Sequence, residues 1–246
     1  MIGTELLDDP RADPVLVGRQ LRDIARLNAL FGGTRAVLRE LEPFFERERR
    51  ETLKDSLTVA GNGKRHTWTL LDVGTGLGDI PRAAAAAARR HGITLRLVGI
   101  ELNRTAARLA RGAEGNGAPL AVALADGGVL PLGPHSVDVI VASQVLHHLP
   151  RAVAVRWIAA FDRVARRAVV LADLRRSRLA MAGVWAASVG LAMSGVTRHD
   201  AVVSLKRGYT LREFRAMLQA AGVTAIVRYQ PGSRIVASWA PDRRYQ

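Results

Sequence analysis

The chain has 246 residues, a formal net charge of +14 and no cysteine. This length suits one α/β domain with a cap and is too short for two full catalytic domains. The lack of cysteine excludes disulfides, thiolate metal sites, iron–sulfur clusters and cysteine nucleophiles. Because the basic residues are almost all arginines spread along the chain, and only 5% of residues are aromatic, the charge indicates a solvated surface more than a nucleic-acid-binding face. A basic rim that steers an anionic substrate stays open.

The first third of the chain precedes the main motif. Residues 1–14 contain Pro10, Pro14 and several acidic residues, which predicts a loose tail; no signal peptide is visible, so we expect a cytoplasmic protein. Apolar residues recur at helical spacing over 15–31 and 34–49, which predicts two helices. The helix break at Gly32 and Gly33 is more consistent with a simple turn than with a ligand contact.

From residue 68 onward, strand-like and helix-like segments alternate, as expected of a parallel α/β sheet. The expected strands are 68–73, 95–100, 120–124, 137–142 and 168–172, and the expected helices are 81–90, 104–111 and 151–165. A helix over 211–221 and strands over 223–229 and 234–239 follow. The apolar run 179–196 reaches the length of a membrane span, but a span there would divide one sheet across a bilayer. We therefore expect a pair of cap helices over the pocket, with peripheral insertion into a membrane as the minor alternative.

The most informative segment is 69–78, where an apolar strand runs into Asp72 and then Gly74, Gly76 and Gly78. Glycines at alternate positions permit positive φ and let a ligand approach the main chain. The spacing G-x-G-x-G departs from the dinucleotide fingerprint G-x-G-x-x-G, and the chain has no Tyr-x-x-x-Lys pair. An NAD-dependent oxidoreductase is therefore disfavoured.

This motif resembles the first motif of the class I S-adenosylmethionine (SAM) methyltransferases. The resemblance implies a single domain with a Rossmann-like, doubly wound seven-stranded sheet whose last strands are antiparallel, plus a helical cap. It assigns Glu101, at the end of the second strand, to the ribose hydroxyls, and Asp126 to adenine. The full set of expected cofactor-binding residues is Asp72, Gly74, Thr75, Gly76, Gly78, Glu101, Leu102, Asp126, Gly127 and Ser143.

The end of the fourth strand bears on the acceptor. Residues 143–146 do not match the Asn/Asp-Pro-Pro-Tyr/Phe motif typical of enzymes that methylate base or amide nitrogen, which favours oxygen or carbon as acceptor. The run Leu-His-His-Leu at 146–149 looks like the ubiquinone/menaquinone-type group of small-molecule methyltransferases. Residues 173–178 and 197–200 are similar to bacterial methyltransferases of aromatic polyketide pathways.

The catalytic candidates are His147, His148 and His199, the last paired in sequence with Asp200. For His147 and His148, a packing role is as consistent with the sequence as a catalytic one. No metal site is expected. We expect a methyltransferase acting on a small molecule, and a homodimer is compatible with the sequence. The alternatives are an RNA methyltransferase, favoured by the charge, and a SAM-binding partner protein without turnover.

Overall fold

The computed structural model describes residues 5–9, 11–58, 66–112 and 118–241. Two helices, α1 (Pro14–Leu30) and α2 (Gly33–Thr58), come first. The central segment comprises β1 (His66–Val73), α3 (Asp79–Arg89), β2 (Ile93–Glu101), α4 (Arg104–Gly112), β3 (Leu120–Leu124), β4 (Val137–Ser143), α5 (Arg151–Val164) and β5 (Ala165–Leu174). The chain continues with α6 (Arg178–Gly190), α7 (Gly195–Arg207), α8 (Leu211–Ala220), β6 (Ile226–Gln230) and β7 (Arg234–Trp239), and short 3-10 turns cover Leu6–Asp8 and Leu146–His148.

The strands form one seven-stranded sheet in the order β3-β2-β1-β4-β5-β7-β6. β1 to β5 pair in parallel, whereas β7 is antiparallel to both β5 and β6. This is the Rossmann-like arrangement with antiparallel last strands that the sequence predicts. The strand order reverses between β1 and β4, and in open α/β sheets ligands bind outside the carboxyl ends of the strands at such a point.

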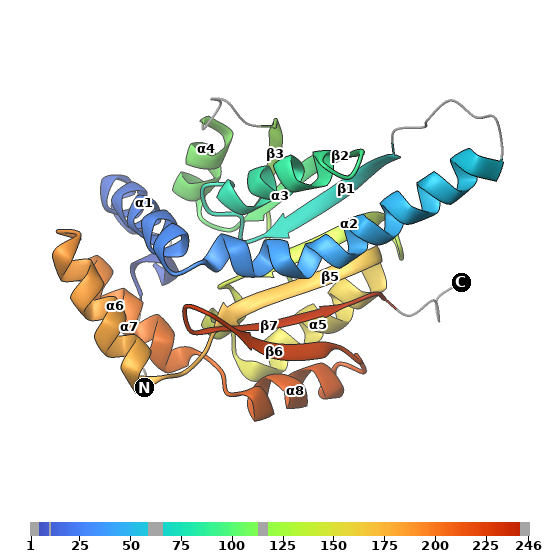
Figure 1. The fold of residues 1–246 in the computed structure, drawn as a ribbon. Coiled ribbons are helices and arrows are strands. Elements are labelled where there is room, and N and C mark those ends of the chain that lie inside the picture. The colour runs from blue at the N-terminus through green and yellow to red at the C-terminus, as the bar shows by residue number, and fades with distance from the viewer. Residues whose placement is uncertain (1–4, 10, 59–65, 113–117, 242–246) are drawn as a thin grey trace.

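Helices cover both faces of the sheet (Figure 1). α2 and α3 bury Leu41, Phe45 and an alanine-rich surface against one face, and α5 and α8 bury Phe161 and Phe214 against the other. The alanines of α3 allow close packing on β1 and β2, because a short side chain brings the helix axis nearer the sheet. The carboxyl ends of the parallel strands face α1, α6 and α7, which lie together at one end of the molecule (Figure 1).

Two expectations about the flanking segments need correction. Helix α2 continues to Thr58, well beyond residue 49. Residues 5–9 are not a loose tail, since Glu5 is 5% exposed and the backbone N–H of Leu6 donates to Asp200 on α7 at 2.8 Å. In the region of the expected cap, α7 and Val184 of α6 line the cavity, and α6 packs on α7 and leaves Leu179 and Trp185 exposed.

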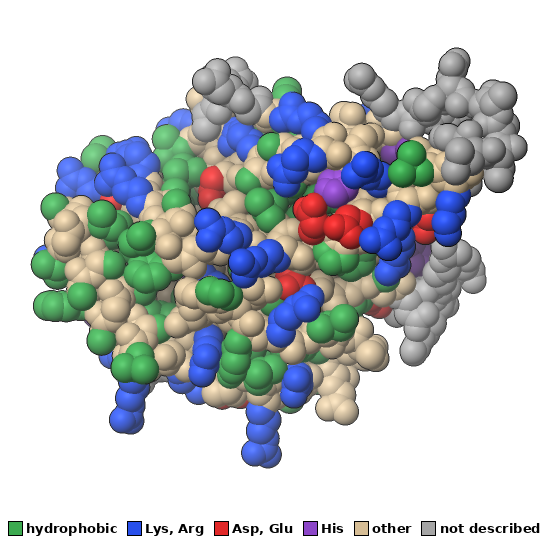
Figure 2. Space-filling model, viewed as in Figure 1, with side chains coloured by type: hydrophobic (Ala, Val, Ile, Leu, Met, Phe, Trp, Pro, Cys, Tyr) green, Lys and Arg blue, Asp and Glu red, His purple; other side chains and the backbone are tan. Residues whose placement is uncertain are grey.

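Among the described residues, no helix combines the length and the apolar character that a membrane crossing needs. Figure 2 shows Lys and Arg side chains scattered among apolar and neutral ones over the visible side of the molecule. On that side the basic residues do not gather into one patch.

Candidate active site

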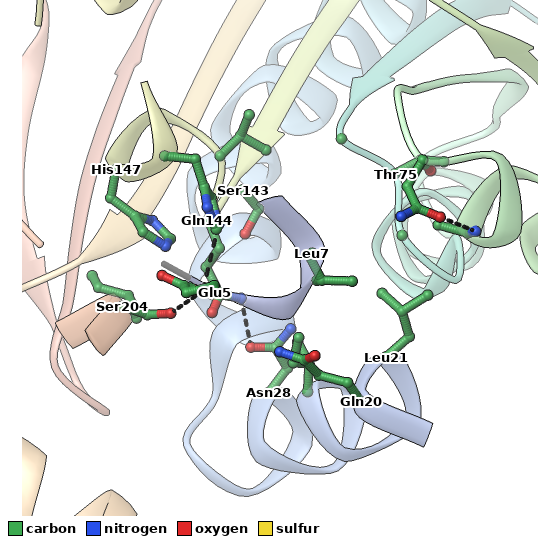
Figure 3. A pocket seen from close by; sticks show the side chains of 18 of the residues that line it. Glu5, Leu7, Gln20, Leu21, Asn28, Thr75, Ser143, Gln144, His147 and Ser204 are labelled. Atoms are coloured by element: carbon green, nitrogen blue, oxygen red, sulfur yellow. Dashed lines mark hydrogen bonds and ion pairs between the residues drawn. The ribbon is translucent and has the colours of Figure 1, made fainter. Parts of the chain in front are cut away.

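A cavity of about 680 Å³ lies at the carboxyl ends of β1, β2 and β4. Its volume falls within the range of about 300–1,000 Å³ that small-molecule sites occupy. The loops that follow these strands supply one wall, and α1, α7 and the turn at Leu6–Asp8 supply the other (Figure 3). The cavity therefore lies between the N-terminal segments and α7 on one side and the ends of the central strands on the other.

The glycine loop after β1 brings main chain to the cavity. Gly74 and Gly76 have φ of 73° and 54°, and both line the cavity. A Cβ on Gly74 would lie 2.4 Å from Cγ2 of Val145, so only glycine fits between β1 and the turn after β4. The hydroxyl of Thr75 donates a hydrogen bond to Oδ2 of Asp72 at 2.8 Å, which holds the loop against the end of β1. A ligand at this loop meets backbone first, as the sequence predicts.

Glu101 ties the ends of β1 and β2 together. Its Oε2 accepts from the N–H of Gly76 at 3.0 Å, and its Oε1 accepts from the N–H groups of Leu102 and Asn103 at 3.0 and 3.1 Å. A carboxylate has about four lone-pair positions, so acceptor capacity remains after these three bonds. Glu101 lines the cavity beside Leu102, whose side chain is 72% exposed although it is apolar. This pair of polar acceptor and open apolar surface suits a nucleoside.

The remaining expected cofactor residues divide into two groups. Asp126 and Ser143 line the cavity, and Oδ1 of Asp126 accepts from the N–H of Gly128 at 2.8 Å. Gly78 and Gly127 are not among the lining residues. A Cβ would lie 2.4 Å from Leu120 at Gly78 and 2.4 Å from Val73 at Gly127, so both glycines serve close packing. The structure does not support their expected contact with a cofactor.

The cavity is acidic inside a basic protein. Its lining carboxylates are Glu5, Asp8, Asp72, Asp79, Glu101, Asp126 and Asp200, and its lining guanidinium is that of Arg234. Burial and the charges of Asp79 and Glu101 raise the pKa of Asp72 to about 7, against the hydrogen bond from Thr75. A cationic ligand would relieve this crowding of negative charge, because an opposite charge favours the ionised carboxylate.

His147 follows β4 and forms a buried pair with Asp173 at the end of β5. Nδ1 of His147 lies 2.6 Å from Oδ1 of Asp173, and the backbone N–H of His147 donates to Oδ2 at 3.2 Å. Burial raises the pKa of Asp173, but the charge and hydrogen bonds of His147 outweigh it and hold that pKa below its usual value. Nε2 of His147 is buried and has no hydrogen-bond partner among the residues that the structure describes, and the residue lines the cavity. The free nitrogen of an oriented imidazole is thus available to a ligand.

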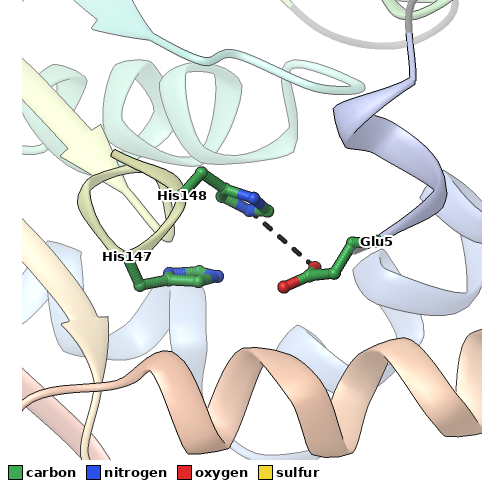
Figure 4. A group of neighbouring side chains, drawn as sticks. All are labelled: Glu5, His147 and His148. Atoms are coloured by element: carbon green, nitrogen blue, oxygen red, sulfur yellow. Dashed lines mark ion pairs between the residues drawn. The ribbon is translucent and has the colours of Figure 1, made fainter. Parts of the chain in front are cut away.

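His148 belongs to a second polar cluster with the N-terminal turn and α7. Its Nδ1 lies 2.8 Å from Oδ1 of Asp8, and Arg207 donates to both Asp8 and Glu5. Figure 4 shows His147, His148 and Glu5 facing one another. Their ligand atoms lie within 4.8 Å of one another, so these described residues have the spacing to hold a metal ion. The guanidinium of Arg207 already supplies positive charge to Glu5, so the cluster links the N-terminal turn to α7.

A family model described as a methyltransferase domain matches residues 71–172, from β1 to β5. The matched segment is less than half of the chain. No curated protein matches the chain. The match supports the predicted class of SAM-dependent methyltransferase.

Solved structures of methyltransferases share the fold. A SAM-dependent methyltransferase from Aquifex aeolicus is 16% identical over 87% of this chain and 96% of its own, with a TM-score of 0.50. The carbon methyltransferase CurJ is 14% identical over 71% of this chain and 48% of its own, also with a TM-score of 0.50. Magnesium protoporphyrin IX methyltransferase from Synechocystis PCC 6803, with bound SAM, is 14% identical over 80% and 77%, with a TM-score of 0.45. At these identities the likeness establishes the fold alone.

The third histidine candidate lies apart from the cavity. His199 and Asp200 are consecutive residues of α7, and of these two only Asp200 lines the cavity. Oδ2 of Asp200 accepts from the side chain of Gln20 and from the N–H of Leu6, so it fastens α1 and the N-terminal turn to α7. Asp200 is thus engaged with α1 and the N-terminal turn, and it does not orient His199.

Sequence reasoning missed three residues of the site. Asp173 lies one residue before the end of β5, and Glu101 ends β2, so the rule that strand ends face the ligand could have found Asp173 as well. Arg234 begins β7, where a charged residue in an otherwise apolar strand was a signal. Glu5 could not be found from the sequence, because no local pattern indicates that it packs against α7, about two hundred positions later in the chain.

Proposed function

We propose that the protein is a SAM-dependent methyltransferase that methylates an oxygen, or a carbon conjugated to it, of a small molecule bearing an acidic hydroxyl. The observation that carries the proposal is the His147–Asp173 pair, whose free Nε2 belongs to a residue lining the cavity. A base needs one nitrogen fixed by a hydrogen bond and the other open to the substrate. The pair meets this requirement.

The cofactor assignment rests on the lining residues of the strand ends. Asp72, Gly74, Gly76, Glu101 and Asp126 line the cavity together. SAM supplies a methyl group on a cationic sulfur, already activated toward displacement. The residues of this chain would bind it through the main chain of the glycine loop, the carboxylate of Glu101 and the acidic field around Asp72.

The acceptor side of the cavity favours an apolar, hydroxylated molecule. Leu7, Ile24, Phe31 and Val184 line the cavity along with the polar groups. Apolar walls exclude water and position a substrate, and positioning can supply much of the rate of a displacement with a good leaving group. We place the acceptor among aromatic, quinone or polyketide-like compounds, with His147 accepting the proton of its hydroxyl.

The deciding experiment has two parts. Calorimetric titration of the purified protein with S-adenosylhomocysteine and with NAD tests the cofactor, and incubation with radiolabelled SAM and a panel of phenols and hydroquinones tests transfer. Binding of S-adenosylhomocysteine together with label transfer to a phenol supports the proposal. Binding without any transfer would favour a SAM-binding partner protein, and binding of NAD would refute the cofactor assignment.

An RNA methyltransferase stays a competitor because of the net charge of +14. The acidic lining of the cavity opposes it, since a phosphate backbone would meet Glu5, Asp8 and Asp200 at the outer wall. The same labelled SAM offered with total RNA tests this competitor directly. Transfer of label to RNA with a steep salt dependence would replace our proposal.

A further inference from the structure

Arg234 is a buried cation that the proposed chemistry does not use. It is the first residue of β7, all six residues of which are buried, and it is itself 4% exposed. It lines the cavity close to Asn28 of α1 and Gln144, which follows β4. A charged side chain in such a place is expensive unless paired, because it has lost the hydration that stabilises it in water.

The guanidinium is only partly satisfied. Its NH2 group donates to Oδ1 of Asn28 at 2.8 Å, whereas Nε and NH1 are buried and have no partner among the described residues. Within that part of the chain no carboxylate forms an ion pair with Arg234. Burial lowers the pKa of Arg234 to about 10, and the more distant charge of Asp173 offsets this only in part.

The groups around Arg234 are donors as well. Oδ1 of Asn28 also accepts from Nε2 of Gln144 at 2.7 Å, so both lone pairs of this oxygen are engaged. Gly33, the first residue of the 26-residue helix α2, lies so close that its Cβ would be 3.0 Å from NH2 of Arg234. The guanidinium therefore faces the partly positive N-terminus of a long helix. Among the described residues, the neutral Oδ1 of Asn28 is the acceptor between these two positive groups, and no carboxylate pairs with Arg234.

We propose that Arg234, with Asn28 and the N-terminus of α2, is a carboxylate-binding site in the wall of the cavity. A planar guanidinium and the free N–H groups of a helix N-terminus both favour a two-oxygen anion. Under the function proposed above, the carboxylate has two sources: the amino-acid end of the cofactor, or an acidic group on the acceptor. In either case a carboxylate of the ligand would pair with the guanidinium of Arg234.

The test compares ligands with and without the carboxylate. S-adenosylhomocysteine and 5′-methylthioadenosine, which lacks the amino-acid end, are titrated calorimetrically into wild type, Arg234→Met and the control Arg39→Met, an exposed arginine of α2. Benzoate and benzamide are titrated into the same three proteins, with and without S-adenosylhomocysteine. Arg234→Lys keeps the charge and serves if the methionine variant does not fold by circular dichroism.

If the cofactor supplies the carboxylate, Arg234→Met weakens S-adenosylhomocysteine at least tenfold and leaves 5′-methylthioadenosine within twofold. If the acceptor supplies it, both nucleosides keep their affinity, wild type prefers benzoate to benzamide at least tenfold, and Arg234→Met loses the preference. Arg39→Met changes neither result. The proposal is overturned if Arg234→Met binds S-adenosylhomocysteine within twofold of wild type and benzoate binds no better than benzamide. If wild type binds neither nucleoside, the proposed function fails, and the benzoate arm still decides the role of Arg234.

Discussion

Nδ1 of His147 and Oδ1 of Asp173 lie 2.6 Å apart, although the two residues are 26 positions apart in the chain. The parallel register of β4 and β5 makes this contact: Ser143 pairs with Ala172, His147 lies in the turn that follows β4, and Asp173 is the last residue but one of β5. A shift of one residue in that register would turn Asp173 to the opposite face of the sheet. The pair is thus a product of the central sheet and does not depend on a mobile loop.

Replacing His147 with Gln should lower kcat at least about a hundredfold, because general bases typically contribute that much. Asp173→Asn should act in the same direction by removing the acceptor that orients the imidazole. His199→Gln, on the same α7 that covers the cavity but outside its lining, should leave kcat unchanged. The measurement is initial rate of methyl transfer, with S-adenosylhomocysteine affinity as the check on folding. A large loss in His199→Gln with an active His147→Gln would reverse the assignment.

Glu101→Ala should weaken S-adenosylhomocysteine about tenfold or more, equivalent to about 1.4 kcal/mol or above. The change removes the expected ribose acceptor and also frees the N–H of Gly76. Glu46→Ala, an exposed glutamate of α2, is the matched control and should bind as wild type does. The check is calorimetry on both variants. Unchanged affinity in a folded Glu101→Ala protein would contradict the ribose assignment.

Comparing Gly74→Ala with Gly92→Ala separates the cost of backbone strain at positive φ from the cost of a steric clash of the new side chain. Both glycines have φ near 75°, but a Cβ at Gly92 meets nothing within 4 Å, whereas one at Gly74 meets Val145. Gly92→Ala should cost about 1 kcal/mol of unfolding free energy through backbone strain alone. Gly74→Ala should cost about 1–3 kcal/mol more, from overpacking. Urea unfolding of both variants measures the difference, and equal costs would mean that the glycine loop tolerates a side chain there.

The His148–Asp8 contact should make stability depend on pH. Burial lowers the pKa of His148, but the hydrogen bond to Asp8 and the charges of Glu5 and Asp8 outweigh it and raise that pKa above 6.5. Burial raises the pKa of Asp8, but its hydrogen bonds, first that with His148, hold it below 3.8. A raised histidine pKa stabilises the fold below pH 6.5 and loses this effect as the pH rises through the folded value.

We therefore expect wild type to exceed His148→Gln in unfolding free energy most between about pH 4 and 6.5. The difference should shrink toward pH 9, as His148 loses its proton in the folded protein. Chemical unfolding at five pH values measures it. In an Asp8→Asn background the difference should be smaller throughout, and a gap that grows with pH would contradict the ion pair.

The sheet could be predicted from the sequence because its signals are local. Strands 120–124 and 234–239 were predicted with the bounds that the structure gives them, since apolar runs between turns define them. The glycine loop and Glu101 followed from the rule that ligands bind at strand ends. The outer wall could not be predicted in this way. Glu5, Asp200 and Arg234 acquire their roles only through contacts that join distant parts of the chain.

Some residues that the sequence singled out lie outside the lining of the cavity. Gly78 and Gly127 fit the expected pattern of cofactor contacts. In the structure a side chain at Gly78 would collide with Leu120, and one at Gly127 would collide with Val73. His199 was a candidate because Asp200 follows it, and in a helix two consecutive residues point in different directions. Sequence adjacency is a poor guide to contact in a helix, whereas the alignment of strand ends is a good one.

The bond from Leu6 to Asp200 joins residues 194 positions apart, and Ser204 and Arg207 hold Glu5 in the same way. The partners on α7 are synthesised long after the N-terminal turn, so the outer wall of the cavity can form only once residues up to Arg207 have been made. A fragment ending at β5 would lack Asp200, Ser204 and Arg207, and with them this wall. Ligand binding should therefore be measured on a protein that includes α7.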